Sequence, residues 1–130
     1  MSIRPEFAEA IFSGEKRFEF RRVVFRQPVD VVVVYATSSV KKVVGEFDVK
    51  RVVSDSVNRL WENTKEWAGI DEQRFFDYFE DVETGYAIEI GNIRRYEEPL
   101  CLDRHLGVRP PQSFQYLDFS WPLWPEHSAA

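Results

Sequence analysis

The spacing of apolar positions predicts a helix and then a strand at the start of the chain. Apolar side chains recur every three or four residues between Pro5 and Gly14. Pro5 suits a first helical turn, and Gly14 can adopt the left-handed conformation that ends a helix. From Lys16 to Arg22 the pattern alternates instead, with aromatic and charged residues on opposite faces. We therefore predict a short amphipathic helix, a tight turn and a strand with one charged face.

The rest of the chain alternates between further strand and helix patterns. Val29–Ala36 is almost entirely β-branched or aromatic, as in a strand covered on both sides, and Val40–Val53 is a longer β-rich run with Gly45 as a bend or bulge. A strand pattern returns at Gly85–Ile90 and continues weakly to Leu100. These strands would form the centre of a sheet or barrel.

Two helices are predicted between the β-rich run that ends at Val53 and the strand that begins at Gly85. Asp55 or Ser56 can cap a helix that runs toward Gly69, and Asp71 can cap one that carries three phenylalanines. With 130 residues and no internal repeat, we expect one α+β domain over residues 1–118. Residues 119–130 would form an aromatic, proline-rich tail that packs on the domain or frays from it. Its tryptophans suit base stacking, a barrel end or a dimer contact.

Composition excludes several classes of protein. No segment approaches the ~18–20 consecutive apolar residues of a membrane helix, so we expect a cytoplasmic protein without membrane contact. The single Cys101, with only His105 and His127 beside it, cannot form an internal disulfide or a Cys/His zinc site. We therefore predict no metal and no cofactor.

Charge is distributed unevenly along the sequence. The net charge is −5, yet ten basic and seven acidic residues precede Val52. From Val52 to Glu83 three basic residues face nine acidic ones, which would repel phosphate. The two central helices are therefore not expected to be a DNA-binding helix-turn-helix, and phosphate would be attracted to the N-terminal part.

The densest charged cluster follows the first helix. Lys16 offers a compact positive charge, Arg21 and Arg22 offer forked donors for phosphate or a base edge, and Glu19 can orient them. The alternative is a solvated strand face with ordinary cross-strand ion pairs. The residues alone leave both interpretations open.

This cluster resembles the signature of a known family. Gly14-x-Lys16-x-x-Glu19-x-Arg21 is similar to the Gly-x-Lys-x-x-Glu-x-Arg motif of ASCH domains, and all four positions match. Similar pieces continue in the order seen in small bacterial and archaeal members, including Ser2-Ile3-Arg4-Pro5, Tyr35-Ala36-Thr37-Ser38, Val44-Gly45-Glu46-Phe47 and Pro110-Pro111-Gln112-Ser113-Phe114. The resemblance runs from Ser2 to about Leu117.

The resemblance implies a PUA-like mixed β-barrel, with a short N-terminal helix, two inserted helices and a cleft beside the first helix. It implies binding of RNA, a nucleotide or a modified nucleobase. Some relatives are ribonucleases, and one branch hydrolyses N4-acetylcytidine with a Lys, a Thr and a Glu. Here Glu19 occupies the position of that Thr, so the amidohydrolase chemistry does not transfer directly.

Five polar residues in two later segments are further candidates for ligand binding. Tyr35, Thr37 and Ser38 end an apolar strand, from which they can reach a cleft or form local turn bonds. Gln112 and Ser113 follow two stiffening prolines and suit either base-edge recognition or closure of the barrel.

Three functions remain open at this point. The first is a binding protein for RNA or a nucleotide-like ligand, regulatory or in RNA metabolism, that uses Lys16, Glu19 and Arg21. The second is a hydrolase of RNA or a modified nucleoside, with Lys16 and Glu19 as candidate catalytic residues and His105 as an alternative acid or base. The third is a protein-interaction domain, possible as a homodimer, built on the aromatic tail and acidic helices.

Overall fold

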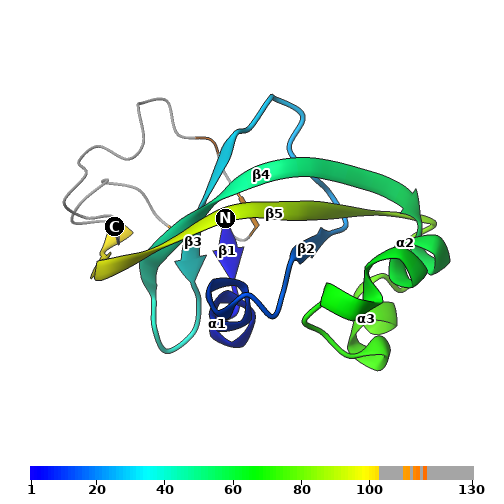
Figure 1. Ribbon diagram of the computed structural model, residues 1–130, viewed down its shortest axis with the longest axis horizontal. Helices are drawn as coiled ribbons and strands as arrows, with labels where there is room; N and C mark the ends of the chain where they lie inside the picture. Colours follow the sequence, from blue (N-terminus) through cyan, green and yellow to red (C-terminus); the bar gives the residue numbers. More distant parts are fainter. Residues whose placement is uncertain (103–109, 112, 115, 117–130) are drawn as a thin grey trace.

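A mixed sheet of five strands and three α-helices forms the part of the chain that the computed structural model describes, which is residues 1–102, 110–111, 113–114 and 116 (Figure 1). The strands lie in the order β1 (Ser2–Ile3), β3 (Val31–Ala36), β4 (Lys42–Ser56), β5 (Thr84–Leu100) and β2 (Phe18–Arg21). β1 runs parallel to β3, and the other neighbours are antiparallel. The predicted α+β class is confirmed. Gln112, His105, His127 and the tail at 119–130 lie outside the described residues.

The sheet curves strongly without closing into the predicted barrel. β1 and β2 are its two edges, and no strand pairing joins them among the described residues. These strands have two and four residues, and among the described residues each pairs with one neighbouring strand. A side chain spans the seam instead, because Arg21 Nη2 donates to the carbonyl oxygen of Ser2 over 2.9 Å.

The helix α1 (Pro5–Ser13) lies beneath the arch of β4 and β5 (Figure 1). It begins with Pro5 and ends at Gly14, whose φ of 88° is left-handed, as the sequence predicts. Ala8 and Ile11 are buried in a core shared with the sheet. This packing fixes the start of β2 beside the helix.

Gly45 marks an irregular point in the sheet where α1 packs closely. The β4–β5 register shifts between Val43 and Gly45, in agreement with the predicted bend. A Cβ at Gly45 would lie 2.5 Å from both the Arg94 carbonyl oxygen and the Phe12 ring. Only glycine therefore allows the helix and the neighbouring strand to approach this far.

The helices α2 (Val57–Thr64) and α3 (Glu72–Tyr78), joined by the 3-10 turn η1 (Lys65–Trp67), connect β4 to β5 (Figure 1). Ser56 and Asp71 cap them as predicted, accepting hydrogen bonds from backbone N–H groups three residues later. None of the described helices is long and apolar enough to cross a membrane. Their inner faces join β2 and β5 in a second core of Phe20, Leu60, Trp61, Ala68, Phe75, Phe79 and Ala87.

Candidate functional site

A cavity of about 600 Å³ opens between the beginning of α1, the strand β2 and the helix α3. The alternation of β2 turns Glu19 and Arg21 to the same side of the strand, while the tight turn at Gly14 places Lys16 next to them. The cavity is lined by Ser2, Ile3, Arg4, Phe7, Lys16, Glu19, Phe20, Arg21, Thr37, Ile70, Arg74, Asp77 and Tyr78. The three central residues of the motif therefore share one concave surface.

Lys16 is the most deeply buried charged group of this cavity, with 2% of its surface exposed. Its Nζ donates to the Ala68 carbonyl oxygen over 2.7 Å and lies 3.9 Å from Glu19 Oε1. The same atom lies 4.8 Å from the centre of the Phe20 ring. Gly69, with φ of +64°, lies against the Lys16 side chain, which a Cβ at this position would overlap. The amine is therefore held in place from several sides.

Burial changes the acidity of Lys16. Removal of water from the ammonium group lowers its pKa from 10.5 to about 8, while the nearby Glu19 carboxylate acts in the opposite direction and Arg21 adds to the decrease. At this pKa the amine can exist in both protonation states near neutral pH. Lys16 is thus a group that can hold or release a proton inside the cavity.

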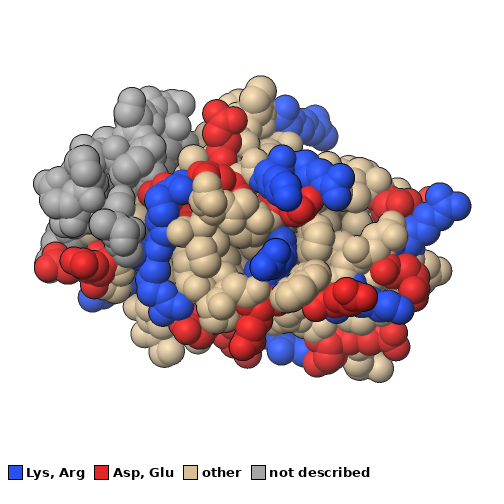
Figure 2. All heavy atoms as spheres, viewed as in Figure 1, with Lys and Arg blue, Asp and Glu red and all other residues tan. Residues whose placement is uncertain are grey.

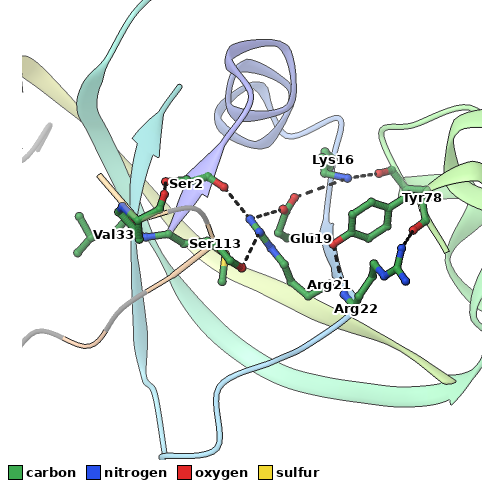
Figure 3. A network of polar contacts seen from close by, with 11 residues as sticks. Ser2, Lys16, Glu19, Arg21, Arg22, Val33, Tyr78 and Ser113 are labelled. Atoms are coloured by element: carbon green, nitrogen blue, oxygen red, sulfur yellow. Dashed lines mark hydrogen bonds and ion pairs between the residues drawn. The ribbon is translucent and has the colours of Figure 1, made fainter. Parts of the chain in front are cut away.

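Glu19 and Arg21 form a buried ion pair that also reaches the C-terminal segment (Figure 3). Glu19 Oε2 lies 3.0 Å from Arg21 Nη2, and Arg21 Nη1 donates to Ser113 Oγ over 3.3 Å. Ser2 N–H in turn donates to the Ser113 carbonyl oxygen over 2.7 Å. Arg21 Nε is buried and has no hydrogen-bond partner. Strand β1, strand β2 and the segment around Ser113 are therefore joined at the cavity floor.

The other predicted site residues lie in different surroundings. Thr37 lines the cavity, whereas Ser38 is exposed just beyond it. Arg22 is exposed beside the cavity, where its backbone N–H donates to the Tyr78 hydroxyl oxygen over 3.2 Å. Tyr35 is buried in an apolar cluster with Val43 and Leu100 and is not part of the cavity lining. Gln112 lies outside the described residues.

Several residues of the cavity wall were not among the site residues predicted from the sequence. Arg4 and Phe7 come from the beginning of α1, and Arg74, Asp77 and Tyr78 come from α3. The last three are spaced by three and four residues, so they share one helix face. This spacing was the available signal in the sequence, but the acidic average over Val52–Glu83 concealed it.

Two of these residues have specific contacts that shape the wall. The Arg74 guanidinium lies over the Phe7 ring, with Cζ 4.7 Å from the ring centre. Burial raises the pKa of Tyr78, so its hydroxyl stays protonated at neutral pH. Because that oxygen accepts a hydrogen bond from Arg22 N–H, the hydroxyl proton is available to a ligand.

The electrostatic character of the cavity differs from that of the whole chain. Four basic and two acidic side chains line it, although the protein carries a net charge of −5. On the face viewed in Figure 2, acidic side chains predominate over α2 and α3, and basic ones lie over the central strands. Among the described residues no group of three or more His, Cys, Asp or Glu side chains is arranged to hold a metal ion. The cavity therefore suits an anionic or polar organic ligand.

Comparison with known proteins places this geometry in a family. The ASCH domain model matches residues 1–99. The chain is 36% identical over 122 residues to the ASCH domain-containing ribonuclease of Zymomonas mobilis, covering 90% of this chain and 82% of the relative. The crystal structure of ASCH from Zymomonas mobilis superposes with a TM-score of 0.83 at 35% identity, covering 90% of this chain and 85% of that one.

A second relative contains the same domain within a longer protein. The chain is 32% identical over 118 residues to a protein of Ureaplasma parvum named ATP synthase subunit alpha. The match covers 90% of this chain but only 15% of that relative. The extent of the family match, together with the similarity to the Zymomonas protein, shows that this chain belongs to the ASCH domain family.

Proposed function

We propose that this protein binds single-stranded RNA and receives one unstacked nucleotide in the cavity between α1, β2 and α3. The observation that carries this proposal is the excess of basic side chains around a cavity of about 600 Å³ on an acidic chain. Pockets for small molecules and cofactors typically enclose about 300–1,000 Å³, which includes the size required by a nucleotide. The acidic remainder of the protein would discourage RNA from binding elsewhere.

The walls of the cavity offer complementary surfaces for a nucleobase. Ile70 and Tyr78 provide apolar and aromatic surface against which a base can pack, while the Phe7 ring already faces Arg74 and Lys16. Thr37 and Asp77 provide polar atoms for its hydrogen-bonding edge. Single-stranded RNA is recognised in this way because its bases can leave the stack, whereas bases in a duplex are not accessible.

A second candidate function is cleavage of the bound RNA, in which the bond from a ribose 2′-oxygen to the adjacent phosphorus forms and the bond from that phosphorus to the 5′-oxygen breaks. It is favoured by the name of the Zymomonas relative, a ribonuclease, and by the lowered pKa of Lys16, about 8. Cleavage by attack of a ribose 2′-hydroxyl needs one group to accept its proton and another to protonate the departing 5′-oxygen. In this proposal Lys16 and Glu19, 3.9 Å apart, share these two roles.

Both candidates can be tested with one fluorescent single-stranded RNA of about twelve nucleotides. We expect Lys16→Met to weaken binding about tenfold, equivalent to about 1.4 kcal/mol, because it removes the buried positive charge from the floor. Lys65→Met is the matched control, since Lys65 is an exposed lysine outside the cavity lining. Fluorescence anisotropy measures the affinity, and thermal unfolding monitored by circular dichroism verifies that each variant is folded.

The outcomes separate the alternatives. Equal affinity of the wild-type protein and the folded Lys16→Met variant would exclude the cavity as the RNA site. Shortening of the RNA on a denaturing gel by the wild-type protein, but not by Lys16→Met, would establish the ribonuclease candidate. Intact RNA with cavity-dependent affinity would establish binding alone.

A further inference from the structure

The basic groups on the cavity floor are already engaged by the protein itself (Figure 3). Lys16 Nζ donates to a backbone carbonyl oxygen and faces Glu19, while Arg21 binds Glu19, the Ser2 carbonyl oxygen and Ser113. The remaining nitrogen of Arg21, Nε, is inaccessible to solvent. A phosphate could reach these donors only by breaking an internal ion pair in a poorly hydrated site, which is unfavourable.

The basic groups at the rim of the cavity are in the opposite situation. Arg4 is exposed and forms no ion pair with another described residue. Arg74 contacts a carboxylate only at 3.8 Å, from Glu6, and both side chains are roughly half exposed. An ion pair of this kind contributes about 0–1 kcal/mol, so an anion can displace it. These two guanidinium groups therefore retain donors for a ligand.

The two arginines both line the cavity and both lie next to the first turn of α1. Arg4 immediately precedes this turn, and its carbonyl oxygen accepts hydrogen bonds from the backbone N–H groups of Phe7 and Ala8. Arg74 reaches the same turn from α3, where Phe7 orients its guanidinium plane. The N-terminus of a helix adds a further positive partial charge. Tyr78, one turn after Arg74, lines the same cavity with a hydroxyl proton to donate.

We propose that Arg4 and Arg74, assisted by the Tyr78 hydroxyl, bind a phosphate of the ligand at the mouth of the cavity. This inference rests on the proposed RNA binding, and not on the cleavage candidate, and it deepens that function because it assigns which end of the nucleotide points outward. The base enters toward Lys16 and Glu19, and the phosphate stays where it remains partly hydrated. Free nucleosides, which have no phosphate, would bind much more weakly than nucleotides.

The test uses the full chain with Arg4→Gln, Arg74→Gln and the matched control Arg59→Gln. Arg59 is an exposed arginine of α2 outside the cavity lining, so its substitution removes the same charge elsewhere. The probes are a single-stranded oligouridylate of about twelve nucleotides, uridine 5′-monophosphate and uridine. Affinity for the oligonucleotide is measured over a series of salt concentrations, and the two small probes are titrated by calorimetry.

RNA binding by the two rim variants, and not by Arg59→Gln, is expected to depend less on salt concentration than RNA binding by the wild-type protein does. A single phosphate contact to single-stranded nucleic acid contributes about 0.7 to the slope of log K against log salt concentration. Because the two arginines share one phosphate, Arg4→Gln and Arg74→Gln should each lower the slope by at most this amount, and each should weaken monophosphate binding about tenfold, which is about 1.4 kcal/mol. Arg59→Gln should leave the slope and both small-probe affinities unchanged.

Several outcomes would overturn the inference. If both rim variants keep the salt slope and the monophosphate affinity of the wild-type protein, this phosphate site is excluded. If Arg59→Gln lowers the slope and the affinity as much as the rim variants do, the effect is one of general charge, and the site is excluded as well. If Lys16→Met abolishes RNA binding while the rim variants do not alter it, the proposed function stands and the phosphate site does not. If the wild-type protein binds neither the oligonucleotide nor the monophosphate, both proposals fail.

Discussion

The burial of Lys16 should make the stability of this protein rise with pH above neutrality. Its pKa is about 8 in the folded protein, against an ordinary value of 10.5. Between these two values the unfolded chain binds more protons than the folded protein, so the free energy of unfolding increases as pH rises. Below about pH 8 the amine is protonated in both states, and the full penalty for burying its charge is present. The penalty disappears progressively toward pH 10.5.

The size of this effect follows from the difference between the two pKa values. Each pKa unit corresponds to about 1.4 kcal/mol, so Lys16 contributes about 3 kcal/mol over the whole window. About 2 kcal/mol of this should be gained between pH 7 and pH 9.5. Such a gain is large against the total stability of about 5–15 kcal/mol that is typical of a single domain.

Urea unfolding followed by tryptophan fluorescence measures this effect in the wild-type protein and in Lys16→Met. Other groups also titrate in this range, but they are common to both proteins and cancel in the difference between them. The wild-type protein should gain about 2 kcal/mol relative to Lys16→Met between the two pH values. A difference that stays constant to within about 0.5 kcal/mol would show that Lys16 has an ordinary pKa and would refute the argument.

Two further predictions concern stability. Gly69→Ala should destabilise the protein by about 2–4 kcal/mol, since a Cβ there is strained and overlaps Lys16. Gly14→Ala, also at positive φ but with open space around the new Cβ, should cost only about 1–2 kcal/mol; equal losses in chemical denaturation would argue against the overlap. Glu46→Gln should lower the free energy of unfolding by about 1–3 kcal/mol, because the two oxygens of the buried carboxylate accept hydrogen bonds from the Tyr96 hydroxyl over 2.6 Å and from Arg94 Nε over 2.8 Å, and an amide keeps only one acceptor oxygen. An unchanged urea midpoint would contradict this role.

The sequence predicted the features that depend on local periodicity. The helix ending at Gly14 and the caps at Ser56 and Asp71 agree with the structure, because propensities and capping bonds act within a few residues. The ASCH motif also indicated residues that the structure brings together, since a turn followed by an alternating strand places Glu19 and Arg21 on one side. These features are determined by neighbours along the chain.

Two features of the structure were not predicted, because they depend on properties that are not local. The charge of Val52–Glu83 was treated as an average, although Arg74 and Tyr78 lie on the one face of α3 that borders the cavity. The predicted barrel is open, because among the described residues Ser2–Ile3 pairs as a strand with β3 alone, and the other edge of Ser2 contacts the Arg21 side chain and the Ser113 carbonyl oxygen. Neither the direction of a helix face nor the partner of a two-residue strand is determined by local sequence.

The sequence by itself determined most of the helices and strands, the family and the motif residues, since each depends on short-range patterns, but it did not predict the strand Ser2–Ile3 or the 3-10 turn Lys65–Trp67. Only the tertiary structure decided which basic side chains bind groups of the protein itself and which keep hydrogen-bond donors for a ligand. Lys16 and Arg21 looked like the natural anion ligands, but long-range contacts to Ala68 and Ser2 engage their donors. Hydrogen bonding and burial depend on residues that are distant along the chain, and folding alone brings those residues together.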